Sequence, residues 1–200
     1  MAEPIDFYFD FTSPYSYLAS ERIDDVAARY GRRVKWRPVL LGAVFKELGT
    51  VSLVKQPDKA DYSVRDFARS ARFLGLPYTQ PAVFPVLTVA PARAYYWLHG
   101  QDCDLARRFA HNVFRAYFAE GRDISATAVL LELAAAAGAE PAAVEAGMQE
   151  PAIKDRLRAE TDGALALGVF GAPWILVDGE PFWGADRLPQ VERWLEAGGF

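Results

Sequence analysis

Apolar and polar residues alternate at the start of the chain, in the stretch IDFYFDF. Every second position from Ile5 to Phe11 is apolar, which predicts a strand with one strongly apolar face. From Pro14 to Tyr30 the apolar positions recur at helical spacing instead, and Gly31 marks a natural end for a helix. The stretch RVKWRPVL then predicts a second strand. This order predicts a parallel strand pair joined by a right-handed crossover.

The long middle of the chain carries amphipathic helical patterns and almost no strand signal. These patterns fill residues 42–167, where the proline-rich stretch GLPYTQPAVFP predicts an extended link between two helices. Strand signals return near the end, where APWILVDGEPFWG predicts a hairpin that turns at Asp178-Gly179. A last helix is predicted from about Asp186.

Strands at both ends and helices between them predict an α/β protein whose single sheet is split between the ends of the chain. This is the chain order of a thioredoxin-like fold with an inserted all-helical domain. The predicted thioredoxin-like domain comprises residues 1–41 and 168–200, and the helical insertion comprises residues 42–167. The 200 residues, of which 52% are hydrophobic, are enough to bury a core.

Charge and composition restrict the partners. A formal net charge of −4 without any Lys/Arg run argues against nucleic acid and anionic membranes, which leaves a small molecule. The chain starts without a basic segment followed by an apolar one, and its most apolar stretch, residues 128–139, is too short to span a bilayer. A cytoplasmic location is therefore expected. No metal site is expected, because the two histidines and one cysteine lack ligand spacing.

The stretch FDFTSPYSYLAS forms the junction between the first strand and the first helix, where thioredoxin-like oxidoreductases hold a Cys-x-x-Cys pair. Here these positions are Ser13 and Ser16, and a single cysteine, Cys103, excludes dithiol chemistry within the chain. Ser13 is either the N-cap of the helix or a hydroxyl that donates a hydrogen bond to a thiolate brought by a ligand. A serine nucleophile is disfavoured, because His99 and His111 both fall on predicted insertion helices.

The dipeptide Ala172-Pro173 immediately precedes the predicted hairpin. In a thioredoxin-like fold this position holds a cis proline that faces the first helix, which would place Pro173 beside Ser13. The backbone of Ala172 could then pair with the main chain of a bound peptide. An ordinary trans proline that opens a strand is the alternative.

Four stretches resemble the 2-hydroxychromene-2-carboxylate isomerase family, in the kappa-class glutathione transferase branch of thioredoxin-like proteins. They are DFYFDFTSPYSYLAS, RPVLLGAVFKELG, KADYSVRDFAR and GVFGAPWILVDGEPFWGADRL. The resemblance implies that glutathione is the cofactor and supplies the sulfur at Ser13, the catalytic residue. It implies cis-trans isomerisation between 2-hydroxychromene-2-carboxylate-type and trans-o-hydroxybenzylidenepyruvate-type compounds in aromatic catabolism. It also implies a homodimer.

The same resemblance assigns the groups that would hold glutathione. Asp186 would receive the γ-glutamyl ammonium, and Lys59 would lie near the glycine carboxylate. The whole predicted glutathione site comprises Ser13, Lys59, Ala172, Pro173, Gly184, Ala185 and Asp186. From the residues alone, Asp186 is equally explained as a helix N-cap and Lys59 as a solvated charge.

The predicted substrate site comprises Lys46, Thr50, Phe84 and Leu87. Lys46 would face the substrate carboxylate, or is only a polar position on a short helix. Thr50 and Leu87 stand where the family often carries an asparagine, and Ala185 stands where it often carries Ser, Gln or Asn. The loss of these polar groups predicts a different or more apolar substrate and one contact fewer to glutathione.

Two other functions stay open at this point. A kappa-type glutathione transferase or peroxidase would use the same site and consume glutathione. A noncatalytic thioredoxin-like binding protein would dock a ligand or peptide without turnover. The products formed, and the binding of glutathione itself, separate these alternatives.

Overall fold

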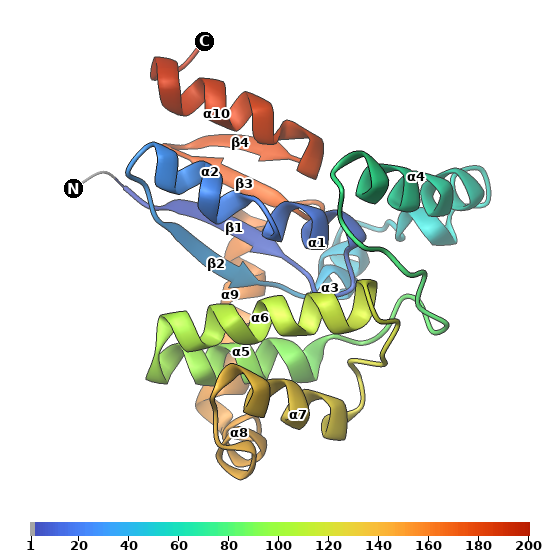
Figure 1. Cartoon of the computed structure of the whole chain (residues 1–200), viewed down its shortest axis with the longest axis vertical. Coiled ribbons are helices and arrows are strands. Elements are labelled where there is room, and N and C mark those ends of the chain that lie inside the picture. Colours follow the sequence, from blue (N-terminus) through green and yellow to red (C-terminus); the bar gives the residue numbers. More distant parts are fainter. Residues whose placement is uncertain (1–2) are drawn as a thin grey trace.

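The computed structural model describes residues 3–200 and shows a four-stranded mixed sheet with helices on both faces (Figure 1). The strands lie in the order β2-β1-β3-β4. Strand β1 runs parallel to β2 and antiparallel to β3, and β3 pairs antiparallel with β4. The bounds are β1 (Ile5–Phe9), β2 (Val34–Pro38), β3 (Trp174–Val177) and β4 (Glu180–Trp183). The predicted split sheet is therefore confirmed, except that residues 1 and 2 of its first segment lie outside the described part.

All regular secondary structure between β2 and β3 is helical, as the sequence predicts. Most of its helices lie along one side of the sheet or beyond its end (Figure 1). One hydrophobic core joins the strands to α5 and α6, and the division into two domains stays a prediction. The helices are α1 (Pro14–Ser20), α2 (Ile23–Arg29), α3 (Leu41–Glu47), α4 (Ala60–Phe73), α5 (Val89–Gln101), α6 (Cys103–Phe118), α7 (Thr127–Ala137), α8 (Pro141–Gly147), α9 (Pro151–Ala166) and α10 (Leu188–Ala197), with short 3-10 helices η1 (Leu53–Lys55) and η2 (Ala185–Arg187).

Strand β1 is buried on both faces, whereas its sequence pattern indicated one apolar face. The side chains of Phe7 and Phe9 lie in the main core with α5 and α6. Tyr8, on the opposite face, packs in a second cluster with Trp174 of β3 and Ala164 of α9, and is 4% exposed. The strand also ends at Phe9, two residues earlier than predicted, because the chain turns there toward α1.

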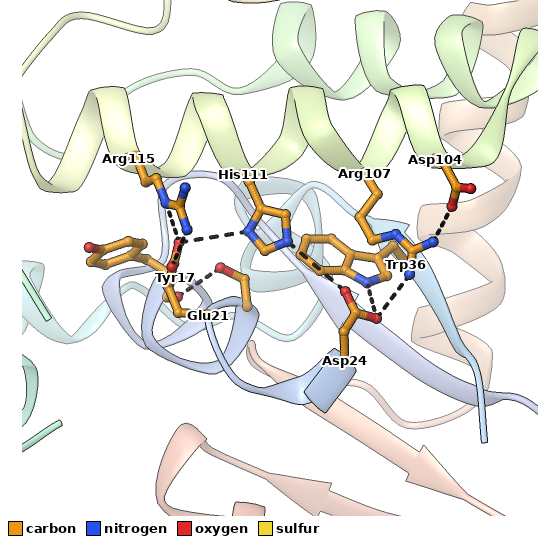
Figure 2. A network of polar contacts seen from close by, with 9 residues as sticks. Tyr17, Glu21, Asp24, Trp36, Asp104, Arg107, His111 and Arg115 are labelled. Carbon is orange, nitrogen blue, oxygen red and sulfur yellow. Dashed lines mark hydrogen bonds and ion pairs between the residues drawn. The ribbon is translucent and has the colours of Figure 1, made fainter. Parts of the chain in front are cut away.

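The helix predicted from Pro14 to Tyr30 is two helices, and this prediction was wrong. Glu21 ends α1, and Arg22 precedes α2 with a non-helical φ of −135°. Side chains of α6 bind both sides of this break (Figure 2). Arg115 donates two hydrogen bonds to the Glu21 carboxylate, at 2.8 and 2.6 Å, and the His111 ring lies between Glu21 and Asp24, at 3.7 and 4.0 Å. The ion pairs to α6 therefore hold α1 and α2 against the core at the point where the helical backbone hydrogen bonds are interrupted.

The Glu21 carboxylate is expected to make stability depend on pH in the acid range. Burial raises its pKa, but the hydrogen bonds from His111 and Arg115 outweigh burial and lower the pKa to about 2, from 4.5. The contribution is therefore complete above pH 4.5 and is lost as the pH falls toward 2. We expect the wild type to lose about 2 kcal/mol of this contribution between pH 6 and pH 3. Urea unfolding at several pH values measures it.

The comparison is the difference in unfolding free energy between the wild type and Glu21→Gln, which should shrink as the pH falls. Glu120→Gln is the matched control, since Glu120 is largely exposed and its contact with Arg122 is 3.9 Å long. A wild-type advantage over Glu21→Gln that stays constant from pH 6 to pH 3 would contradict the role of the ionised carboxylate.

Candidate functional site

Ser13 stands at the N-terminus of α1 and faces the Ala172-Pro173 turn. Its Oγ accepts a hydrogen bond from the Ser16 N–H at 3.1 Å, so Ser13 is the N-cap of α1. The same hydroxyl donates to the Ala172 carbonyl oxygen at 3.0 Å. The Ala172-Pro173 peptide bond is cis, as predicted, and so is Phe84-Pro85, which the sequence did not single out. Ser13 therefore caps the helix, as one interpretation of the sequence predicted, and it lies beside the cis proline; its hydrogen bond to a thiolate stays a prediction.

The positive end of the α1 dipole at Ser13 is weak. The helix has seven residues, whereas a helix as far as Tyr30 was predicted. Pro14 at its first position has no N–H, and the N–H of Ser16 already donates to Ser13. An anion at Ser13 would therefore depend more on the hydroxyl itself than on the helix dipole.

Ser13 opens into a cleft of about 890 Å³. Segments far apart in sequence form its walls: the start of α1, the stretch from Thr50 to Gln56, α4, and the segments around Ala172 and Gly184. Of the predicted site residues, the structure brings these eight to the lining: Ser13, Thr50, Lys59, Phe84, Ala172, Gly184, Ala185 and Asp186.

Three predicted site residues do not line the cleft. Lys46 is exposed on α3, and Leu87 is 81% exposed. Pro173 contributes through its backbone, because its carbonyl oxygen accepts the Gly184 N–H at 3.0 Å. This hydrogen bond joins the cis-proline turn to the Gly184 turn.

The turn at Gly184 requires glycine. Its φ of +118° and ψ of 149° lie in a region that other residues rarely adopt, and a Cβ there would overlap Asp186 Oδ1. Asp186 lies inside η2 and makes no capping hydrogen bond, so its interpretation as a helix N-cap was wrong. Its carboxylate is 72% exposed and lies 3.2 Å from the Arg187 guanidinium. Asp186 is therefore open to a cationic group at the rim of the cleft.

Aromatic side chains form an apolar wall of the cleft next to Ala172. The rings of Phe170 and Trp183 meet edge to face at 4.7 Å, and Trp174 supports Phe170 at 5.0 Å. A Cβ at Gly171 would lie 2.6 Å from Trp183 Nε1, so Trp183 covers the backbone of Gly171 closely. Both Phe170 and Trp183 line the cleft while remaining about half exposed, at 43% and 50%. Such a wall suits an aromatic ring.

The sequence did not single out Tyr15 and Asp66, which also line the cleft. The Tyr15 hydroxyl donates a short hydrogen bond to Asp66, and burial together with this carboxylate raises the pKa of Tyr15. Burial raises the pKa of Asp66, but the hydrogen bonds from Tyr15 and Arg69 outweigh it and lower the pKa. The one signal in the sequence is the spacing of Asp66 and Arg69, which is typical of an exposed helix face and does not indicate a site.

The cysteine and its neighbour His99 lie outside the cleft. Cys103 is the first residue of α6, where Asp102 is the N-cap. Its Sγ is exposed and lies 3.6 Å from His99 Nε2. Within residues 3–200 no group of His, Cys, Asp and Glu could hold a metal ion. In the same range no helix has the length and apolar character needed to cross a bilayer.

A strand–helix–strand unit, a cis proline beside the first helix and two serines at the dithiol positions define a thioredoxin-like protein without its own redox pair. A profile of the DSBA-like thioredoxin domain matches residues 4–196. The chain is 32% identical to a 2-hydroxychromene-2-carboxylate isomerase from Sphingobium xenophagum, over 98% of this chain and 99% of that protein. It is 31% identical to glutathione S-transferase kappa 1 of Caenorhabditis elegans, over 96% of this chain and 90% of that protein.

A solved structure of a 2-hydroxychromene-2-carboxylate isomerase matches the fold with a TM-score of 0.86 at 29% identity, over 97% of this chain and 95% of that one. The chain therefore belongs to the DSBA-like thioredoxin domain family, in the branch that contains 2-hydroxychromene-2-carboxylate isomerases and kappa-class glutathione transferases, and it is an enzyme. The predicted α/β thioredoxin-like fold and the family resemblance are confirmed.

Proposed function

We propose that this enzyme is a glutathione-dependent cis-trans isomerase that interconverts 2-hydroxychromene-2-carboxylate-type and trans-o-hydroxybenzylidenepyruvate-type compounds in aromatic catabolism. One observation carries the proposal. A serine hydroxyl lies at the thiol position of a thioredoxin-like site and opens into a cleft with an aromatic wall, in a chain whose only thiol lies elsewhere. The names of the two relatives, an isomerase and a glutathione transferase, support the proposal.

The residues around Ser13 fit glutathione. Lys59 at the start of α4 would face its glycine carboxylate, and Asp186 would face the γ-glutamyl ammonium. Gly184, which has a positive φ of +118° and no side chain, allows the backbone of the turn to approach the ligand closely. When bound, glutathione would supply a thiolate that adds to the double bond of an unsaturated α-keto acid and departs after rotation.

In the proposed reaction the chain holds charge and orients groups. Ser13 turns its hydroxyl proton from the Ala172 carbonyl toward the sulfur, while its oxygen keeps the hydrogen bond from the Ser16 N–H. The Ala172 carbonyl is then able to accept a backbone N–H of the ligand. Phe170 and Trp183 hold the aromatic ring and exclude water on that side. Thr50 and Phe84 remain the proposed substrate contacts, whereas the positions of Lys46 and Leu87 outside the cleft do not favour theirs.

Calorimetric titration with glutathione, followed by product analysis, tests the proposal. We expect glutathione to bind, and trans-o-hydroxybenzylidenepyruvate to be converted to its isomer only in the presence of glutathione, which is recovered unchanged. S-methylglutathione is the matched control ligand, because it keeps the ends of the molecule and should bind without supporting turnover.

A glutathione conjugate as the product would instead favour a kappa-type transferase, and binding without turnover would favour a noncatalytic binding protein. An absence of glutathione binding would contradict both glutathione-dependent functions, the isomerase and the transferase. A homodimer and a cytoplasmic location stay part of the proposal. Light scattering, which measures the molar mass in solution, tests the homodimer.

A further inference from the structure

The carboxylate of Asp10 is buried behind the Ser13 turn, and the proposed reaction gives it no role. Asp10 follows β1 directly and is 2% exposed. Burial raises its pKa, and hydrogen bonds from Thr12, Thr88 and Leu41 oppose this effect. A buried carboxyl group is costly unless its oxygens are hydrogen-bonded, so its partners show what it stabilises.

Three donors from three separate segments bind the Asp10 carboxylate. Oδ1 accepts the N–H of Thr12 at 3.0 Å and the hydroxyl of Thr88 at 2.7 Å. Oδ2 accepts the N–H of Leu41 at 2.7 Å. The backbone carbonyl of Asp10 also accepts the N–H of Ser13, at 2.9 Å. Asp10 thus binds the Ser13 turn through both its side chain and its main chain.

Each of the three segments leads to a wall of the cleft. Thr12 and Leu41 line the cleft themselves, at the turn before α1 and at the start of α3. Thr88 precedes α5 and follows the link whose Phe84 and Pro85 line the cleft. The Thr12 hydroxyl also accepts the Val86 N–H at 3.3 Å, which joins this link to the Ser13 turn a second time. One buried carboxylate therefore connects the Ser13 turn with two cleft walls that are distant in sequence.

We propose that Asp10 is a positioning residue: its carboxylate fixes the Ser13 turn relative to the starts of α3 and α5, and so sets the place of the Ser13 hydroxyl in the cleft. This inference rests on the proposed function for its effect on glutathione. The positioning itself is a property of the free protein.

The bonding pattern explains why an amide cannot replace the carboxylate. Both Asp10 oxygens accept a backbone N–H, one from Thr12 and one from Leu41. An asparagine offers one oxygen and one NH₂ group, so in either orientation an NH₂ donor faces a backbone N–H donor. Asp10→Asn keeps the size of the side chain and must release either the Ser13 turn or the start of α3.

Hydrogen exchange in the free protein and the pKa of the bound glutathione thiol test the proposal together. In Asp10→Asn we expect exchange of the Thr12 or the Leu41 amide to rise about tenfold. We also expect the pKa of the bound thiol to rise toward its value in Ser13→Ala, because the hydroxyl no longer meets the sulfur. Thr161→Val is the matched control: Thr161 is also buried and accepts the Leu40 N–H at 3.3 Å without contacting Asp10.

Unchanged exchange at both amides would overturn the proposal. So would a lowered thiol pKa, since that is the result expected if Asp10 acts only through its negative charge. If Asp10→Asn does not fold, Thr88→Val removes a single donor and should raise the thiol pKa by a smaller amount, and no change there would equally overturn it. If the wild type binds no glutathione, the proposed function fails, while the exchange measurement still decides the positioning.

Discussion

Replacing Ser13 with alanine is expected to lower glutathione-dependent turnover by roughly 10- to 100-fold, the loss that follows from a hydrogen bond to a charged group worth about 1.5–3 kcal/mol. The Ser13 hydroxyl is the group at the thiol position, and in the free protein it donates a hydrogen bond to the Ala172 carbonyl oxygen at 3.0 Å. Without it the sulfur of the ligand has no donor there and its thiol ionises less readily. The ends of glutathione keep their contacts, so kcat should fall more than the KM for glutathione rises. Steady-state kinetics with trans-o-hydroxybenzylidenepyruvate measure both.

Ser16→Ala is the matched control for this variant. Ser16 lies in the same helix and is fully buried, and its Oγ has no hydrogen-bond partner among residues 3–200, so its removal should leave turnover near the wild-type rate. Ser13→Ala also removes the N-cap of α1, which costs about 1 kcal/mol of stability. Thermal unfolding must therefore show that both variants are folded at the assay temperature. Equal turnover of Ser13→Ala and Ser16→Ala would refute the role of the hydroxyl.

The sequence predicted the fold well because its strongest signals lie where the sheet forms. Alternation in IDFYFDF and the Asp178-Gly179 turn predict strands and a hairpin from local geometry alone, and both are confirmed. The break between α1 and α2 was missed because the apolar spacing continues across it. At this break Glu21 contacts Arg115 and His111 on α6, and Arg115 is 94 positions away in the sequence. A local pattern of apolar residues contains no information about such distant contacts.

Without the family resemblance, the candidate site was predictable only where the fold itself implied neighbours. The thioredoxin-like chain order placed Pro173 beside Ser13, and the structure brings the Ala172 carbonyl to the Ser13 hydroxyl. Tyr15 and Asp66 were missed because their contact joins α1 to α4, and the path of α4 across the cleft depends on tertiary packing. Lys46 shows the opposite error: this cation lies near a motif in sequence, but it is exposed on α3 and does not line the cleft.

Replacing Gly184 with alanine is expected to weaken glutathione binding by about tenfold or more, through displacement of Asp186. Alanine at a φ of +118° and ψ of 149° carries a backbone strain of about 1–3 kcal/mol. Its Cβ would also overlap Asp186 Oδ1, so the carboxylate must move away from the place proposed for the γ-glutamyl ammonium. The N–H of Gly184, which donates to the Pro173 carbonyl at 3.0 Å, would shift with it. Calorimetric titration with glutathione measures the loss, and thermal unfolding measures the strain.

Gly179→Ala separates the two effects, because it also places alanine at a positive φ but without the overlap. Gly179 lies in the hairpin turn with a φ of +91°, and a Cβ there would meet nothing within 4 Å. Both variants should lose stability, while the affinity for glutathione should fall only in Gly184→Ala. Binding that is equally weak in both would mean that general destabilisation, and not the position of Asp186, sets the affinity. Binding that is unchanged in both would remove Asp186 from the proposed glutathione site, because its carboxylate cannot stay in place beside an alanine at position 184.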